Sequence, residues 1–176
     1  MQQWRGGKVI PHGFTLIEVL IVVAIIGILA RYVLPSIKNG LDKAYVARAA
    51  TELHSINESL EMYKNDHGGN FPPDADRDIP PGLEQYLAPG VWPDAAWPGS
   101  VFDWENWIDP ISGERIYQIS IRFCPVNQPA QCRFPGSDWA QDFDYFSSVY
   151  YCISGACRSH INKPLNHPGH CINCGD

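Results

Sequence analysis

The chain has 176 residues, of which 45% are hydrophobic, and a formal net charge of −6 at pH 7. That length allows one ordinary domain together with an extended element. The acidic balance argues against a nucleic-acid-binding protein, because no basic stripe is present to neutralise phosphates. We therefore expect no specific nucleic-acid partner.

The strongest local feature is an apolar block at residues 14–30, which reads FTLIEVLIVVAIIGILA. Together with residues 32–34 it approaches the roughly 20 residues that cross a bilayer. Arg5 and Lys8 precede the block, and positive charge favours keeping that end in the cytoplasm. The block also holds Glu18, and a carboxylate in lipid is costly unless it is paired. We expect a single membrane span whose N-terminal side stays in the cytoplasm and in which Glu18 has a function.

The segment GFTLIEVLIVVAIIGILA resembles the prepilin motif of the type IV pilin superfamily, which includes type IV pili, type II secretion pseudopilins and competence pilins. The resemblance implies that a prepilin peptidase cuts between Gly13 and Phe14 and N-methylates Phe14. The new amine of Phe14 would then pair with Glu18 during assembly, which offsets two burial penalties. The implied partners are further copies of the chain in a helical homopolymer, the peptidase/methyltransferase, and an inner-membrane platform with its assembly ATPase.

Beyond the block, the apolar spacing predicts an amphipathic helix. Its apolar positions recur at steps of three and four: Ile37, Leu41, Tyr45, Ala49, Leu53, Ile56, Leu60 and Tyr63. The turn-forming residues 67–70 and the following Phe71-Pro72-Pro73 end the helix near Asp66. Gly27 and Pro35 are predicted to kink it, because proline removes a backbone donor and clashes with the preceding turn.

The remaining residues predict a small head. Residues 71–114, rich in proline, tryptophan and acidic side chains, are interpreted as a connector with a short helix at 83–87. Alternation at 117–123 predicts a strand, a second is expected at 146–153, and Ser154-Gly155 predicts a hairpin turn into a third at 157–161. The predicted fold class is α+β, with a long N-terminal helix packed against a small antiparallel sheet.

These expectations divide the chain into four parts. Residues 1–13 form a cleaved leader, 14–35 the transmembrane and filament-core helix, and 36–69 the amphipathic half of the helix. Residues 70–176 form the head, with an αβ-loop, the sheet and a cysteine-rich tail.

The cysteines all follow the apolar block, so export would expose them to an oxidising compartment. Their spacing favours the pairs Cys124–Cys132, Cys152–Cys157 and Cys171–Cys174, although six cysteines allow 15 connectivities. A zinc site is the alternative, because residues 171–174 form a CxxC and three histidines lie close by: His160, His167 and His170.

We expect no cofactor, with calcium as the alternative. Asp74, Asp76 and Asp78 alternate as in a calcium loop, but the loop lacks the usual glycine, and Gln85 stands where a bidentate glutamate belongs.

No nucleophile elbow, phosphate loop or HExxH motif is present, so we do not expect an enzyme. The predicted function is a structural subunit of a type IV pilus-like filament, exposed at the cell surface after assembly. One alternative is the major pseudopilin of a type II secretion system. Another is a monomeric, membrane-anchored binding module whose tryptophan-rich head captures a ligand.

Overall fold

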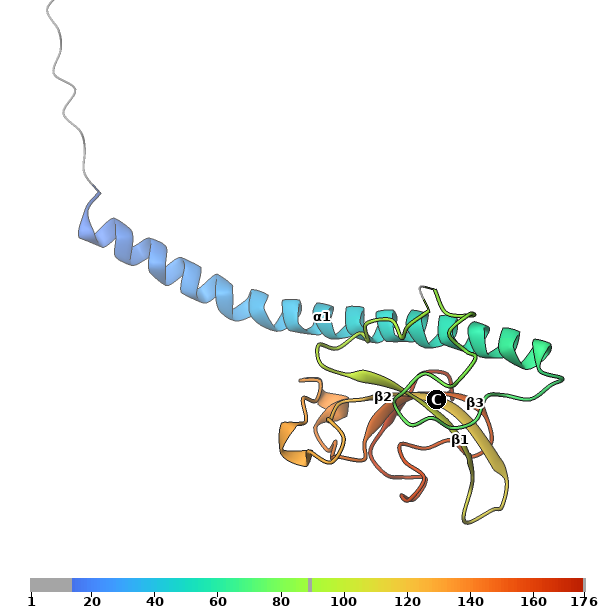
Figure 1. Cartoon of the computed structure of the whole chain (residues 1–176). Helices are drawn as coiled ribbons and strands as arrows, with labels where there is room; N and C mark the ends of the chain where they lie inside the picture. Colours follow the sequence, from blue (N-terminus) through green and yellow to red (C-terminus); the bar gives the residue numbers. More distant parts are fainter. Residues whose placement is uncertain (1–13, 89, 176) are drawn as a thin grey trace, which may run out of the picture. The chain divides into compact units, whose positions relative to one another are not determined.

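The computed structural model describes residues 14–88 and 90–175 (Figure 1). One long helix, α1 (Leu16–Asp66), precedes a sheet built from four strands: β1 (Val101–Ile108), β2 (Arg115–Arg122), β3 (Ser148–Ser154) and β4 (His170–Cys171). Two short 3-10 turns, η1 (Pro129–Gln131) and η2 (Asp138–Ala140), lie between β2 and β3. The result is a pilin-like α+β fold, as predicted. The chain divides into two compact units after Gly40.

Helix α1 ends where the sequence places its end. The amide of Gly69 donates to the carbonyl of Lys64 at 2.8 Å, and both Gly68 and Gly69 adopt positive φ. Glycine adopts this left-handed conformation without a side-chain clash, so the pair closes the last turn. Gly27 and Pro35 both lie within the helix.

The sheet order is β1-β2-β3-β4, with β1, β2 and β3 antiparallel and β4 parallel to β3. The sheet is therefore mixed, which corrects the antiparallel prediction. The third strand predicted at 157–161 is also wrong. After the turn at Gly155, Arg158 and Ser159 bind side chains of β2 and β3 and so leave no ladder with β3.

Two further predictions for residues 71–114 fail. No helix forms at 83–87, where turns bury Leu83 and Leu87 instead. The presumed connector also contains the strand β1, in which Phe102 and Trp104 are fully buried. The acidic residues that alternate with them, Asp103 and Glu105, are buried as well.

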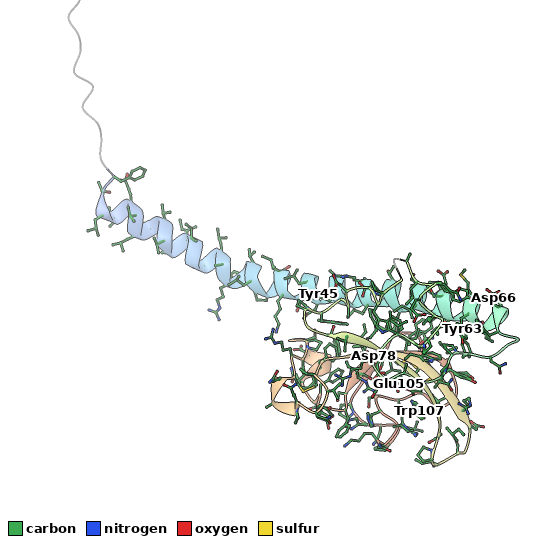
Figure 2. The ribbon with its side chains drawn as sticks, viewed as in Figure 1. Tyr45, Tyr63, Asp66, Asp78, Glu105 and Trp107 are labelled. Atoms are coloured by element: carbon green, nitrogen blue, oxygen red, sulfur yellow. A yellow bond between two sulfur atoms is a disulfide. The ribbon has the colours of Figure 1, made fainter. Side chains whose placement is uncertain are left out.

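One face of the sheet packs on the second half of α1 and forms the apolar core. Buried side chains of α1 meet alternate residues of the strands: Ala49, Leu53, Ile56, Leu60 and Tyr63 with Phe102, Trp104, Ile119, Ile121 and Val149. Figure 2 shows Tyr45 and Tyr63 on α1 and, further from it within the head, Glu105 and Trp107. The apolar stripe of the sequence is therefore the core-facing side of the helix from Ala49 onward, whereas Ile37 and Leu41 remain exposed.

The opposite face of the sheet is polar and also buried. The side chains there are Asp103, Glu105, Gln118, Ser120 and Arg122. The segment that contains Arg158 and Ser159 covers them. Gln118 exchanges hydrogen bonds with the backbone of Arg158 at 2.8 and 3.1 Å, and Arg122 donates to the Ser159 carbonyl at 2.7 Å.

Candidate processing and assembly site

Helix α1 begins with a reciprocal cap formed by Thr15 and Glu18. One carboxylate oxygen of Glu18 accepts bonds from the backbone amide and the hydroxyl of Thr15, both at 2.8 Å. The Glu18 amide in turn faces the Thr15 hydroxyl oxygen at 3.3 Å. This is a capping box, which satisfies amides that the first turn leaves free. It holds the carboxylate at the helix end beside Phe14.

The side chains around this carboxylate are apolar and exposed. Phe14 is 85% exposed, and the large apolar side chains that follow, as far as Leu34, are at least half exposed. Within the described residues, α1 is the one helix whose length and mean hydropathy, 2.5 over its most apolar window, would suit a membrane span. Such a surface needs a partner, since soluble proteins rarely expose contiguous apolar patches of this size.

Of the other predicted helix residues, Gly13 lies outside the described part of the chain, so the cleavage position stays a prediction. Gly27 and Pro35 lie within an uninterrupted α1. The predicted kink also stays a prediction.

The six cysteines form three disulfides, Cys124–Cys132, Cys152–Cys157 and Cys171–Cys174. Asn173, inside the last pair, binds both backbone groups of Cys152, at 2.8 Å through its oxygen and 2.7 Å through its nitrogen. The tail is thereby fixed to β3.

The structure does not gather Asp74, Asp76 and Asp78 into a metal site. Within the described residues, no group of three or more His, Cys, Asp or Glu side chains is arranged to hold a metal ion. The two oxygens of Asp74 instead accept backbone bonds from Asp76 at 3.0 Å and Asn106 at 3.2 Å. Asp74 thus fastens its loop to β1, and partial burial raises the pKa of its carboxyl. The calcium alternative stays a prediction.

The tryptophans mostly pack in the core. Trp97, Trp104 and Trp107 are buried, and the indole nitrogen of Trp104 donates to the Pro72 carbonyl at 3.1 Å. Trp92 similarly donates to the Arg77 carbonyl at 3.2 Å. These contacts stabilise the proline-rich loop, because indole nitrogens bind carbonyls that no strand partner satisfies.

The buried charges of the polar face were not foreseen from the sequence. Arg122 bridges Asp103 at 2.9 Å and Glu105 at 2.5 Å. Burial, and after it the charge of Glu105, raises the pKa of Asp103 to about 7 although Arg122 opposes the shift. A second pair, Arg158 with Asp109 at 2.5 Å, lies beside it, and the hydrogen bond from Arg158 lowers the pKa of Asp109 to about 2. One sequence signal pointed this way: acidic residues that alternate with Phe102 and Trp104.

Comparison with known families identifies the apolar helix. Residues 11–30 match the prokaryotic N-terminal methylation motif. The recognition made from the sequence is therefore confirmed: the chain carries the methylation motif of the type IV pilin superfamily. This motif, the long exposed helix and the α+β head are together the features of a type IV pilin-like subunit.

Its curated relatives are more specific. The chain is 44% identical over 55 residues to the type II secretion system core protein G of Vibrio cholerae. The aligned segment is 31% of this chain and 38% of that protein. The chain is 46% identical over 55 residues to the protein of the same name from Pseudomonas aeruginosa (31% and 39%) and 38% identical over 56 residues to that of Escherichia coli K12 (32% and 39%). The chain thus spans less than two fifths of the length of these relatives. No solved structure matches it.

Proposed function

We propose that this chain is a pseudopilin, a filament subunit of a type II secretion system. The homology to core protein G favours this alternative over the surface pilus that the sequence first suggested. The observation that carries the proposal is the position of Glu18, a carboxylate held at the end of an exposed apolar helix beside the residue at the predicted cut.

In this proposal the precursor spans the inner membrane through residues 14–35, and the peptidase cuts after Gly13. The new amine of Phe14 is methylated and remains a cation. Glu18, whose carboxylate the capping box orients toward the helix end, neutralises such an amine of the same or an adjacent subunit. This ion pair stabilises one axial register between neighbouring helices. It therefore guides assembly and also offsets the cost of burying the two charges.

The partners follow from that route. Further copies cover the apolar surface, the prepilin peptidase acts on the precursor, and the secretion platform and its ATPase extract subunits from the membrane. The filament then stands outside the inner membrane, where the three disulfides stabilise a head exposed to shear and proteolysis.

The test is expression of the full chain with a type II secretion apparatus, followed by shearing and intact-mass analysis. We expect filaments whose subunit begins at methylated Phe14 and is lighter by the six hydrogens of three disulfides. Glu18→Ala should abolish filaments while leaving processing and the head's melting temperature unchanged. Glu61→Ala, which removes a carboxylate from the exposed side of the same helix, is the matched control.

Two outcomes would contradict the proposal. An unprocessed chain confined to the membrane would favour the anchored binding module. Filaments that form without the secretion apparatus but with pilus machinery would restore the surface pilus.

A further inference from the structure

The head has an apolar groove with an acidic rim. It lies between α1 and the loop that includes Leu87 and Pro93, and its volume is about 470 Å³. Its apolar lining includes Ile56 and Met62, and its charged residues are Glu52 and Glu58; among the described residues no Lys or Arg side chain lines it, although Arg48 pairs with Glu52 from beside it. The groove therefore favours a ligand that combines apolar side chains with positive charge.

Glu52 indicates most directly that the groove takes a cation. One oxygen of its carboxylate accepts a bond from Arg48 Nε at 2.6 Å, whereas the other is buried and has no partner in the described structure. The side chain is only 15% exposed. Because this oxygen is closed to solvent, an outside donor reaches it only after the Glu52 side chain turns toward the groove; the donor would then satisfy a buried acceptor that otherwise has none.

A matching surface lies earlier on the same helix. Arg31, Leu34, Lys38 and Leu41 are all exposed, and steps of three, four and three place them on one face. Within the groove, Glu52, Ser55, Ser59 and Met62 repeat the same steps. The two sets form stripes with one spacing: the first carries two basic and two apolar residues, and the second carries one acidic, two serine and one apolar residue.

The two stripes align between two parallel copies when one copy is shifted by 21 residues. This shift sets Arg31 against Glu52, Leu34 against Ser55 and Leu41 against Met62. The same shift brings Lys38 against Ser59, beside Glu58. Leu41 and Met62 are 55% and 54% exposed, so their contact also removes apolar surface from water. In helix length the shift is about 30 Å.

We propose that the groove receives residues 31–41 of a second copy of this chain, with Arg31 at Glu52 and Lys38 at Glu58. The proposal rests on the proposed function, since a filament supplies parallel copies at fixed shifts. These contacts would fix the axial register between subunits at a second place, remote from Glu18. They would also pair Arg31 with a carboxylate when the helix leaves the membrane.

The test uses the exposed pair, because charge reversal there leaves the core of the head intact. Full-length chains carrying Lys38→Glu, Glu58→Lys or both are expressed with the assembly machinery, and sheared filament is measured relative to processed subunit. Each single change should lower the yield about threefold, a factor within the range expected from one exposed ion pair. The double change should restore it. Glu61→Lys, on the same helix but outside the groove, should have no such effect.

A second cycle addresses the buried oxygen. Arg31→Gln and Glu52→Gln should each reduce filament yield, and the double variant should be no worse than either single variant. The head's melting temperature, measured for each Glu52 and Glu58 variant, separates a lost contact from a misfolded head.

The outcomes distinguish this proposal from the proposed function. If the wild-type chain forms no filaments, the proposed function is wrong. If filaments form and the reversals match the control, or the double reversal does not recover, the groove proposal alone is wrong. Loss of yield with Glu58→Lys but not with Lys38→Glu would assign the groove to another protein and would also overturn the proposal.

Discussion

The two units place apolar and charged groups in opposite ways. In residues 14–40 the large apolar side chains are exposed, and one carboxylate, Glu18, lies among them. In the head, apolar side chains are buried on one face of the sheet, while Asp103, Glu105 and Arg122 are buried on the other. The apolar side chains of the first unit are thus not covered within the chain, whereas the buried groups of the head are covered by other segments of the head.

This difference separates assembly from folding. In the proposed function the exposed helix is covered by lipid or by other copies, so changes there should leave the head intact. The buried charges of the head are satisfied within one chain, so changes there should act without any partner.

The largest effect is expected from Arg122→Met. Loss of the guanidinium leaves Asp103 and Glu105 buried without their cation, which costs about 3–5 kcal/mol. Chemical denaturation of the purified head should show this loss, while membrane association of the full chain should not change. Arg133→Met, at an exposed arginine, is the control, and equal effects of the two changes would argue against a buried network.

Ile25→Asp should have the converse effect. A carboxylate at this exposed apolar position opposes membrane insertion by about 3 kcal/mol, whereas the head should keep its melting temperature. Alkaline extraction of membranes measures the first quantity and calorimetry of the head the second. Ile25→Leu should behave as wild type in both, and a lowered melting temperature would show that the units are energetically coupled.

The stability of the head should depend on pH through Asp103. Its folded pKa of about 7 lies above that of an unfolded aspartate, so between pH 5 and pH 8 the folded state binds the extra proton. Stability from this group therefore falls as the pH rises, by about 2–3 kcal/mol across that interval. Burial and the charge of Arg122 lower the pKa of His160 to about 4, which acts in the opposite direction as the pH falls below 6.5.

Asp103→Asn isolates the first effect, because the contribution of His160 is common to both chains. In denaturation experiments, the free energy of unfolding of the variant minus that of wild type should increase as the pH rises from 5 to 8. Asp142→Asn, at an exposed aspartate, should show no such increase. Parallel curves for wild type and Asp103→Asn would assign the pH dependence to other groups.

Calcium should have the smallest effect. Asp74 already accepts two backbone bonds, so calcium should not shift the melting temperature relative to a chelator. Magnesium at equal ionic strength controls for screening. A saturable, calcium-specific increase that Asp74→Asn and Asp78→Asn remove would establish the alternative made from the sequence.

The elements set by local spacing were predictable from the sequence. The helix and its end at Asp66 follow from periodicity and from glycine at positive φ, and β2 and β3 follow from alternation. The residues of the capping box were also in view, since Glu18 was chosen for its unusual position. Its bonds to Thr15 were missed, although a threonine three residues before a glutamate is the signature of this cap.

The remaining features depend on contacts between distant residues. Strand β1 was missed because it lies in a segment that was interpreted as a connector. Burial of its Asp103 and Glu105 is favourable only because Arg122 of β2 and the covering segment at Arg158 contact this face. The strand expected at 157–161 was wrong for the same reason, since that segment satisfies this polar face. Which charges meet across a sheet is a property of register, which spacing along one segment does not encode.

The edges of the sheet have a further consequence. At the β1 edge, the amide of Asn106 donates to the side chain of Asp74. On the opposite side, past the short strand β4, the backbone of Cys152 in β3 binds the side chain of Asn173. Open strand edges invite pairing with strands of other molecules. In the proposed filament, which would hold many heads at high local concentration, these two loops occupy edge groups of β1 and β3 and so hinder such pairing.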